Sequence, residues 1–146
     1  MRNANLNPAH RSRSGAVLFE MAIVLPLLLS LTFGACEWGY FIFAKNALQG
    51  AAREGARAAI VTGGTASAVQ TAVDTAMLNS GFAQSKYTRP PTITDQNGVT
   101  INFATVTSGT PIIVTVSSTW GTIGFTPSLT ISSGKAMSAA VTMRKE

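Results

Sequence analysis

The stretch that decides the fold is "AVLFEMAIVLPLLLSLTFGACEWGYFIFA", residues 16–44. Its only charged side chains are Glu20 and Glu37, and the residues between them are uncharged and mostly apolar. A helix rises about 1.5 Å per residue and needs about 20 apolar residues to cross a bilayer. We therefore predict one membrane-spanning helix over 16–44, with Glu37, Trp38 and Tyr40 as the anchor at its far interface.

Most of the excess positive charge lies before this stretch. The chain has 146 residues and a net charge of +5, but residues 16–146 hold eight Lys or Arg against six Asp or Glu. Arg2, Arg11 and Arg13 belong to the N-terminal segment, so the basic balance does not predict a nucleic-acid-binding face. A basic flank favours the cytoplasmic side of a membrane. We expect a cytoplasmic N-terminus, one crossing, and the bulk of the chain outside.

Glu20 is the residue that an ordinary membrane anchor does not explain. Insertion scales assign an acid at mid-bilayer about 2.5–3.5 kcal/mol, and even a shallower Glu20 asks for a partner. The basic leader ends at Gly15, and the order Gly15, "AVLF", Glu20, apolar helix resembles the processing site of type IV prepilins. The resemblance implies a peptidase cut between Gly15 and Ala16. The new α-amino group, with a pKa near 7.7–8.0, would lie about 6 Å along the helix axis from the Glu20 carboxylate of its own or a neighbouring chain.

A wider segment, residues 13–59, resembles the N-terminal module of TadE-like minor pilins (pseudopilins) of tight-adherence, Flp-type systems. The matching elements are Glu20, Pro26 within "VLPLLL", Glu37 before an aromatic residue and Gly39, and the small-residue segment "AAREGARAA". Major pilins of these systems usually carry tyrosine after the glutamate and are much shorter. Met21 at that position, and the length of the chain, therefore favour a minor pilin.

The resemblance implies a function, partners and a location. The chain would be cut by a prepilin peptidase and take part in assembling a Flp-type pilus. Its partners would be that peptidase, other pilin and minor pilin subunits, the inner-membrane assembly platform and the lipid bilayer. It would reside in the bacterial inner membrane, with its C-terminal domain extracytoplasmic.

Two positions in the apolar stretch have predictions of their own. Pro26 removes one backbone hydrogen bond and clashes with the carbonyl of Ala22, which predicts a helix kink that neighbouring groups in a membrane can tolerate. Glu37 is predicted to be a solvated acid at the interface, and Cys36 an apolar filler.

Two alternatives to a processed pilin stay open. The first is an uncleaved, membrane-anchored module whose outer domain binds an envelope partner. The second is a lipoprotein modified at Cys36, because "FGAC" resembles a lipoprotein signal. The bulky Phe33 and the apolar "EWGYFIFA" after Cys36 weigh against this second alternative.

Two helical segments are predicted beyond the apolar stretch. The first helix should continue as an amphipathic extension over 45–61, and "TGGT" should end it. Its inward positions are Ala47, Ala51, Ala58 and Val61. A second helix should cover 66–80, and its inward stripe is Val69, Val73, Ala76 and Met77.

Strand signals dominate from residue 90 to 146. "PTITDQNGVTINFATVT" predicts two strands around an Asn97-Gly98 turn, and "PIIVTVSSTW" and "KAMSAAVTMRKE" alternate as strands do. Residues 121–134 are predicted to be a long exposed loop. The fold class is α+β: a leader peptide over 1–15, a transmembrane helix over 16–44, and a pilin-like domain over 45–146, together a lollipop.

No catalytic or metal-binding set is visible. The single histidine, His10, lies in the leader, and Asp74 and Asp95 stand alone in sequence. We therefore expect no enzyme activity, no cofactor, no metal and no nucleic-acid partner.

Overall fold

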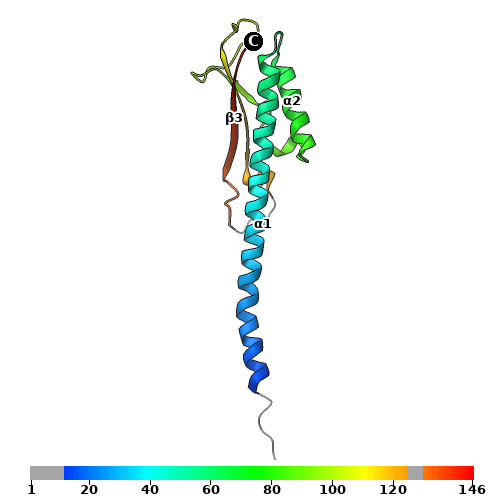
Figure 1. Cartoon of the computed structure of the whole chain (residues 1–146), viewed down its shortest axis with the longest axis vertical. Coiled ribbons are helices and arrows are strands. Elements are labelled where there is room, and N and C mark those ends of the chain that lie inside the picture. Colours follow the sequence, from blue (N-terminus) through cyan, green and yellow to red (C-terminus); the bar gives the residue numbers. More distant parts are fainter. Residues whose placement is uncertain (1–11, 125–129) are drawn as a thin grey trace, which may run out of the picture. The chain divides into compact units, whose positions relative to one another are not determined.

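The computed structural model describes residues 12–124 and 130–146. The expected leader therefore lies largely outside the described residues, as does part of the expected loop over 121–134. The elements in chain order are α1 (Ser12–Ile60), α2 (Ala66–Asn79), the short 3-10 helix η1 (Gln84–Lys86), β1 (Thr92–Thr94), β2 (Pro111–Thr119), α3 (Trp120–Ile123) and β3 (Ala136–Arg144) (Figure 1). The chain divides into two compact units: unit 1 ends at Cys36, and unit 2 runs from Glu37 to Glu146.

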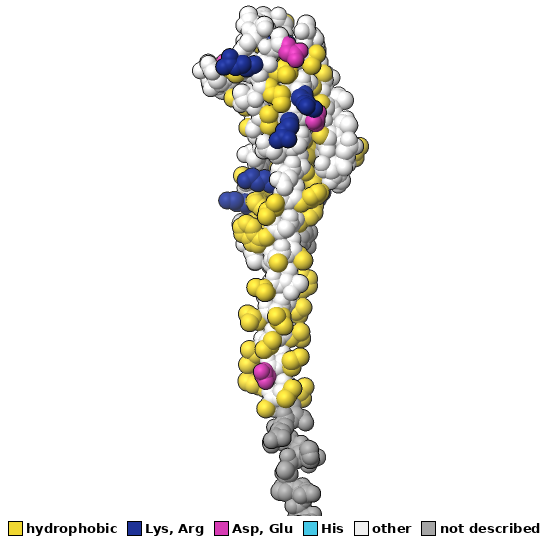
Figure 2. Space-filling model, in the orientation of Figure 1, with side chains coloured by type: hydrophobic (Ala, Val, Ile, Leu, Met, Phe, Trp, Pro, Cys, Tyr) yellow, Lys and Arg dark blue, Asp and Glu magenta, His cyan; other side chains and the backbone are white. Residues whose placement is uncertain are grey.

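The described part of unit 1 is the N-terminal part of α1, up to Cys36. Its large hydrophobic side chains are exposed along its length, and Figure 2 shows them covering this part of the helix. By length and composition it belongs to the one helix, among the described residues, that could cross a membrane. Because the carbonyl and amide groups of a helix bond within it, such a segment satisfies its own backbone in lipid.

In unit 2, the same helix buries a face of six alanines and one leucine, which we call the alanine face. The buried positions are Ala44, Ala47, Leu48, Ala51, Ala52, Ala56 and Ala59. The predicted inward positions Ala47 and Ala51 are confirmed, and Ala58 is half-buried. The prediction for Val61 is wrong: α1 ends at Ile60, so Val61 leaves the helical period and is exposed.

The second helix forms almost as predicted. Thr65 is its N-cap, where the hydroxyl accepts a hydrogen bond from the amide of Ala68 at 3.1 Å. The predicted stripe is confirmed at Val69, Val73 and Met77, which are buried against α1 and the sheet. In Figure 1, α2 and β3 lie on either side of the C-terminal half of α1.

The sheet has three antiparallel strands in the order β1-β2-β3. The central strand β2 alternates as predicted, with Ile112, Val114 and Val116 buried and the intervening residues half-buried. Its full length pairs with β3, from Pro111 opposite Arg144 to Thr119 opposite Ala136. The predicted α+β class is therefore confirmed.

The predicted hairpin around Asn97-Gly98 is wrong in part. The turn exists, but its second arm forms only a single bridge, from Thr100 to Thr94, and β1 pairs with β2 instead. The Asp95 carboxylate accepts hydrogen bonds from the amides of Asn97 (2.8 Å) and Val99 (2.9 Å). These amides are thereby satisfied within the turn.

The predicted exposed loop over 121–134 is also wrong in part. Its first residues belong to α3, and two of its apolar side chains, Ile123 and Ile131, are buried together with Trp120. These residues pack in the same core cluster as Leu48 and Met137. Part of the segment therefore closes the core.

Candidate processing segment and buried glutamate

The predicted processing site lies in the first turns of α1. Gly15 and Ala16 are both exposed, and a Cβ added at Gly15 would meet no atom within 4 Å. The described fold therefore does not need glycine at this position. A requirement for glycine here would have to arise outside the described fold.

Glu20 lies on unit 1 with its side chain exposed. In the part of the chain that the structure describes, no hydrogen bond or ion pair reaches its carboxylate. The predicted pairing with a new N-terminus stays a prediction. Exposure of the carboxylate is what such a pairing requires.

Pro26 lies inside α1, which continues through it. The hydroxyl of Ser30 donates a hydrogen bond to the Pro26 carbonyl at 2.8 Å, and Thr32 bonds the Leu28 carbonyl in the same way. Such bonds back to the carbonyl four residues earlier satisfy the hydroxyls of polar residues within an apolar helix. The predicted kink stays a prediction.

Glu37 is the largest departure from expectation in this segment. It was predicted to be solvated, but its side chain is completely buried. Oε1 accepts hydrogen bonds from Trp120 Nε1 at 3.2 Å and from the Ile131 amide at 3.4 Å. Oε2 accepts them from the Thr130 amide at 2.7 Å and the Thr130 hydroxyl at 2.6 Å. The prediction that Glu37 is solvated is therefore wrong. The predicted position of Glu37 at a membrane interface stays a prediction.

The partners of Glu37 explain why a carboxylate lies there. Three of them are N–H groups, which can only donate, and an ionised carboxylate is a group that can only accept. They come from α3 and from the segment just before β3, more than 80 residues away in sequence. Glu37 therefore fixes the first turn of unit 2 to the chain that closes the core.

The two predicted aromatic anchors have different surroundings. Trp38 is 53 % exposed and meets Phe41 edge to face, with ring centroids 5.8 Å apart. Tyr40 is half-buried: its ring packs on Trp120 at 5.9 Å, and its hydroxyl donates to the Ile123 carbonyl at 3.3 Å. Of the two, Trp38 is the side chain that unit 2 leaves accessible.

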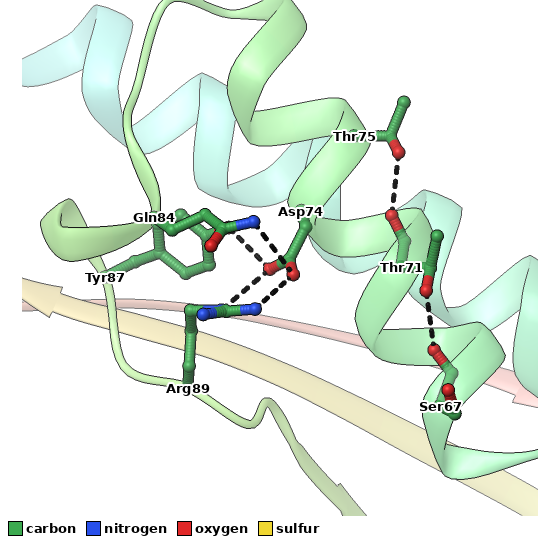
Figure 3. A network of polar contacts seen from close by, with 7 residues as sticks. All are labelled: Ser67, Thr71, Asp74, Thr75, Gln84, Tyr87 and Arg89. Atoms are coloured by element: carbon green, nitrogen blue, oxygen red, sulfur yellow. Dashed lines mark hydrogen bonds and ion pairs between the residues drawn. The ribbon is translucent and has the colours of Figure 1, made fainter.

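A second polar network joins α2 to the segment before β1 (Figure 3). The Asp74 carboxylate accepts a hydrogen bond from the Tyr87 hydroxyl at 2.6 Å and from Arg89 Nε at 3.0 Å. Arg89 Nη2 also forms an ion pair with the other carboxylate oxygen, and the Gln84 amide approaches it at 3.5 Å. This two-point contact of guanidinium and carboxylate is the strong, oriented form of the pair.

The network shifts the protonation of its members. Partial burial raises the pKa of the Asp74 carboxyl, but the hydrogen bonds from Arg89 and Tyr87 outweigh it and hold that pKa below 3.8. Burial, followed by the bond to Asp74, raises the pKa of Tyr87 above its ordinary 10.0. Asp74 is therefore an anion and Tyr87 a neutral donor at neutral pH.

Neither network was predicted from the sequence. Asp74 stands alone in sequence, and its partners lie 13 and 15 residues further along the chain. The residues around Glu37 gave one usable signal, a carboxylate in an otherwise apolar helix that needs donors from elsewhere. In the described ranges, no cluster of three or more His, Cys, Asp or Glu side chains could hold a metal ion.

Comparison with known proteins gives one match. Residues 15–57 match the model of a family described as "TadE-like protein". Neither the curated proteins nor the solved structures contain a match to this chain. The matched segment begins at Gly15 and includes Glu20, Pro26 and Glu37. The predicted resemblance to TadE-like proteins is therefore confirmed over residues 15–57 of this chain.

Proposed function

We propose that the chain is a minor pilin or pseudopilin that a prepilin peptidase cuts between Gly15 and Ala16, and that takes part in assembling a tight-adherence pilus. The TadE-like segment indicates a role in Tad pilus systems, and this family is not an enzyme family. The single observation that carries the proposal is the position of the match. It starts at Gly15 and joins the glycine, the exposed Glu20 and the apolar helix in one segment.

We further propose that the membrane-spanning part of α1 is shorter than residues 16–44. From Glu37 onward the helix packs within unit 2, and Glu37 and Ala44 are completely buried there. Polar loop backbone such as that of Thr130 is not tolerated against hydrocarbon. A span over 16–36 is about 31 Å long at 1.5 Å per residue, which matches a hydrocarbon core of about 30 Å.

The long apolar helix fits a single-pass membrane anchor. In the proposed topology, the basic N-terminal segment stays on the cytoplasmic side and unit 2 lies outside the inner membrane. The partners are the prepilin peptidase, other pilin subunits, the assembly platform and lipid. After cleavage, Glu20 would pair with the N-terminal ammonium of this chain or a neighbour, which offsets its burial in lipid.

The lipoprotein alternative fits the family match less well. A cut before Cys36 would discard residues 15–35, nearly half of the matched segment 15–57. It would also leave no use for Gly15 and Glu20. The match therefore favours a cut at Gly15.

The N-terminal residue and intact mass of the membrane-extracted protein, made together with a prepilin peptidase, test this function. We expect a start at Ala16. Gly15→Leu should block processing and leave the precursor mass unchanged, because the added side chain meets the peptidase and meets no part of the described fold.

Gly39→Leu is the matched control, since Gly39 also lies on α1 with no atom near an added Cβ. It should be processed like the wild type. A wild-type start at Met1, or at a lipidated Cys36, would contradict the proposal and favour the corresponding alternative.

A further inference from the structure

Three lysines lie at the end of unit 2 that begins with Glu37. Lys45 is on α1, two turns beyond Glu37, with an exposed side chain. The Lys135 carbonyl accepts a hydrogen bond from the Trp120 amide, and the Trp120 ring bonds Glu37. The Lys86 carbonyl accepts one from the hydroxyl of Ser118, two residues before Trp120. Contacts thus place all three near the first turns of unit 2.

The acidic side chains of unit 2 are buried, paired with arginine or lie elsewhere, and Glu54 forms an ion pair with Arg57 on α1. Glu37 is buried among donors, and Asp74 is paired with Arg89. The Glu146 backbone amide donates a hydrogen bond to the Ile60 carbonyl at the other end of α1, and Asp95 follows β1 on the side where β2 begins. Toward the lower end of unit 2, the face shown in Figure 2 carries basic but no acidic side chains.

A hollow at this end has several hydroxyl groups in an otherwise mainly apolar lining. Its volume is about 370 Å³, and its lining includes Thr88, Ser117, Thr119, Thr122 and Ser138. Lys86 and Lys135 each directly precede a lining residue, Tyr87 and Ala136. Hydroxyl groups can donate hydrogen bonds to a phosphate diester, which offers only acceptors to them.

Exposed apolar side chains lie at the same end of unit 2. Trp38, Ile42 and Phe43 are each about half exposed, although they neighbour a well-packed core. Trp side chains favour the headgroup level of a bilayer, and lysines near it attract acidic lipid over about a Debye length. The combination matches a lipid surface better than it matches open solvent.

We propose that the Glu37 end of unit 2 binds the headgroups of acidic phospholipids in the bilayer that anchors the chain. Lys45, Lys86 and Lys135 supply the charge, and the hydroxyl groups of the hollow supply hydrogen-bond donors to a headgroup. This inference rests on the membrane anchor in the proposed function but not on processing or pilus assembly. It gives unit 2 a preferred lipid environment.

Bromine quenching of Trp38 tests the inference on the full chain in bilayers of equal phosphatidylcholine and phosphatidylglycerol. The headgroup mixture is kept constant, and only the lipid that carries brominated chains is exchanged. Quenching needs close approach, and Trp120 is only 1 % exposed, so Trp38 dominates the signal. We expect brominated phosphatidylglycerol to quench about twofold more than brominated phosphatidylcholine, because each lysine attracts acidic lipid.

The triple variant Lys45→Gln, Lys86→Gln, Lys135→Gln should bring this ratio close to one. The triple variant Arg53→Gln, Arg57→Gln, Arg144→Gln removes the same charge from exposed positions elsewhere on unit 2 and should leave the ratio unchanged. Raising the salt concentration should lower the wild-type ratio without any substitution, so the test does not depend on a variant that folds.

The inference would be overturned if the two brominated lipids quenched the wild type equally. It would also be overturned if the lysine and the arginine triple variants lowered the quenching ratio to the same extent. Absence of quenching by either lipid would overturn the membrane anchor as well. A chain that is not cut at Gly15 but shows the lysine-dependent ratio would contradict the processing proposal and leave this inference standing.

Discussion

At the scale of single residues, Glu37 shows how a charge is accommodated within an apolar helix. Its carboxylate accepts hydrogen bonds from N–H groups of Trp120, Thr130 and Ile131, and removing the carboxylate would remove the acceptor of these bonds. A buried donor without a partner loses its hydration and gains nothing in return. Glu37 is therefore required by the chain that surrounds it.

We expect Glu37→Gln to lower the thermal stability of unit 2 nearly as much as Glu37→Ala does. A glutamine side chain has one acceptor oxygen and one NH2 group, which can only donate. In one orientation of the side chain, this NH2 group would face the Thr130 amide, which is also a donor. Thermal unfolding followed by near-ultraviolet circular dichroism measures this, because Trp120 contacts the site. Glu54→Gln, an exposed acid on the same helix, is the control and should change the melting temperature little. A stable Glu37→Gln variant would contradict the requirement for an anion.

Asp74 gives a prediction for pH dependence. We expect Asp74→Asn to lower the free energy of unfolding by about 1 kcal/mol at neutral pH, a modest value because the network is partly exposed to solvent. The folded pKa of Asp74 lies below 3.8, so its contribution is complete above that pH and is lost as the pH falls through the lowered pKa. The two proteins should therefore converge in stability in acid.

Ultraviolet titration of the phenol supplies the second measurement for this network. Asp74→Asn should lower the pKa of Tyr87 toward 10.0, because the hydrogen bond and the charge of Asp74 both raise it. Thr75→Ala, an exposed neighbour on α2 that only bonds the Thr71 carbonyl, should leave that titration unchanged. An unshifted Tyr87 would show that the bond does not form in solution.

At the scale of elements, α1 packs closely against both α2 and β2 at Gly55. A Cβ added there would lie 2.7 Å from Val73 Cγ2 and 3.1 Å from Val114 Cγ1. Valine has one strongly preferred rotamer in a helix and yields little. The small-residue face of α1 thus sets how closely the second helix and the sheet approach it.

The matched pair Gly55→Ala and Gly50→Ala tests this contact. Gly50 lies on the same helix with nothing within 4 Å of an added Cβ, so alanine should stabilise by up to about 1 kcal/mol through helix propensity. Gly55→Ala gains the same propensity but overpacks, at about 1–3 kcal/mol. Denaturant unfolding should therefore rank Gly50→Ala above Gly55→Ala, and equal stabilities would contradict the close approach.

Periodic elements were predicted well, and contacts between distant segments were not. The stripe on α2 and the alternation along β2 follow from local spacing alone. The predicted hairpin at Asn97-Gly98 does not form as a strand pair, because β1 pairs over its whole length with β2 instead. The pairing residues of β2 lie about 20 positions further along the chain. Glu37 was misjudged for the same reason, since its donors come from the far end of the chain.

The residues of the candidate site also differ in whether local sequence could predict them. Gly15, Ala16 and Glu20 were identified because a processing segment is contiguous and carries its pattern in sequence. The Asp74 network has no such pattern, because a turn and η1 bring Tyr87 and Arg89 back to α2. Tyr40 resembles an interfacial anchor by its position in the sequence, but its hydroxyl donates a hydrogen bond to the Ile123 carbonyl.

At the scale of the whole molecule, the proposed function requires unit 1 to pack among other subunits. We expect Glu20→Ala to be cut at Gly15 but to enter pilus assemblies several-fold less than the wild type, because the pairing with a new N-terminus is lost. Co-purification of pilus components from the membrane measures incorporation, and the intact mass measures cleavage. Glu54→Ala, an exposed acid on the part of α1 in unit 2, should be incorporated normally. Wild-type incorporation of Glu20→Ala would rule out a pairing role.

The pairing of β3 with β2 also determines when the sheet can be completed during synthesis. Between the end of α1 and the start of β3 lie 75 residues, and a ribosome needs roughly 4–15 s to add them at 5–20 residues per second. During that interval the alanine face of α1 has no completed sheet to cover it. Its small side chains expose little apolar surface to which other chains could bind. The face that later packs closely against α2 and the sheet therefore also limits aggregation of the nascent chain.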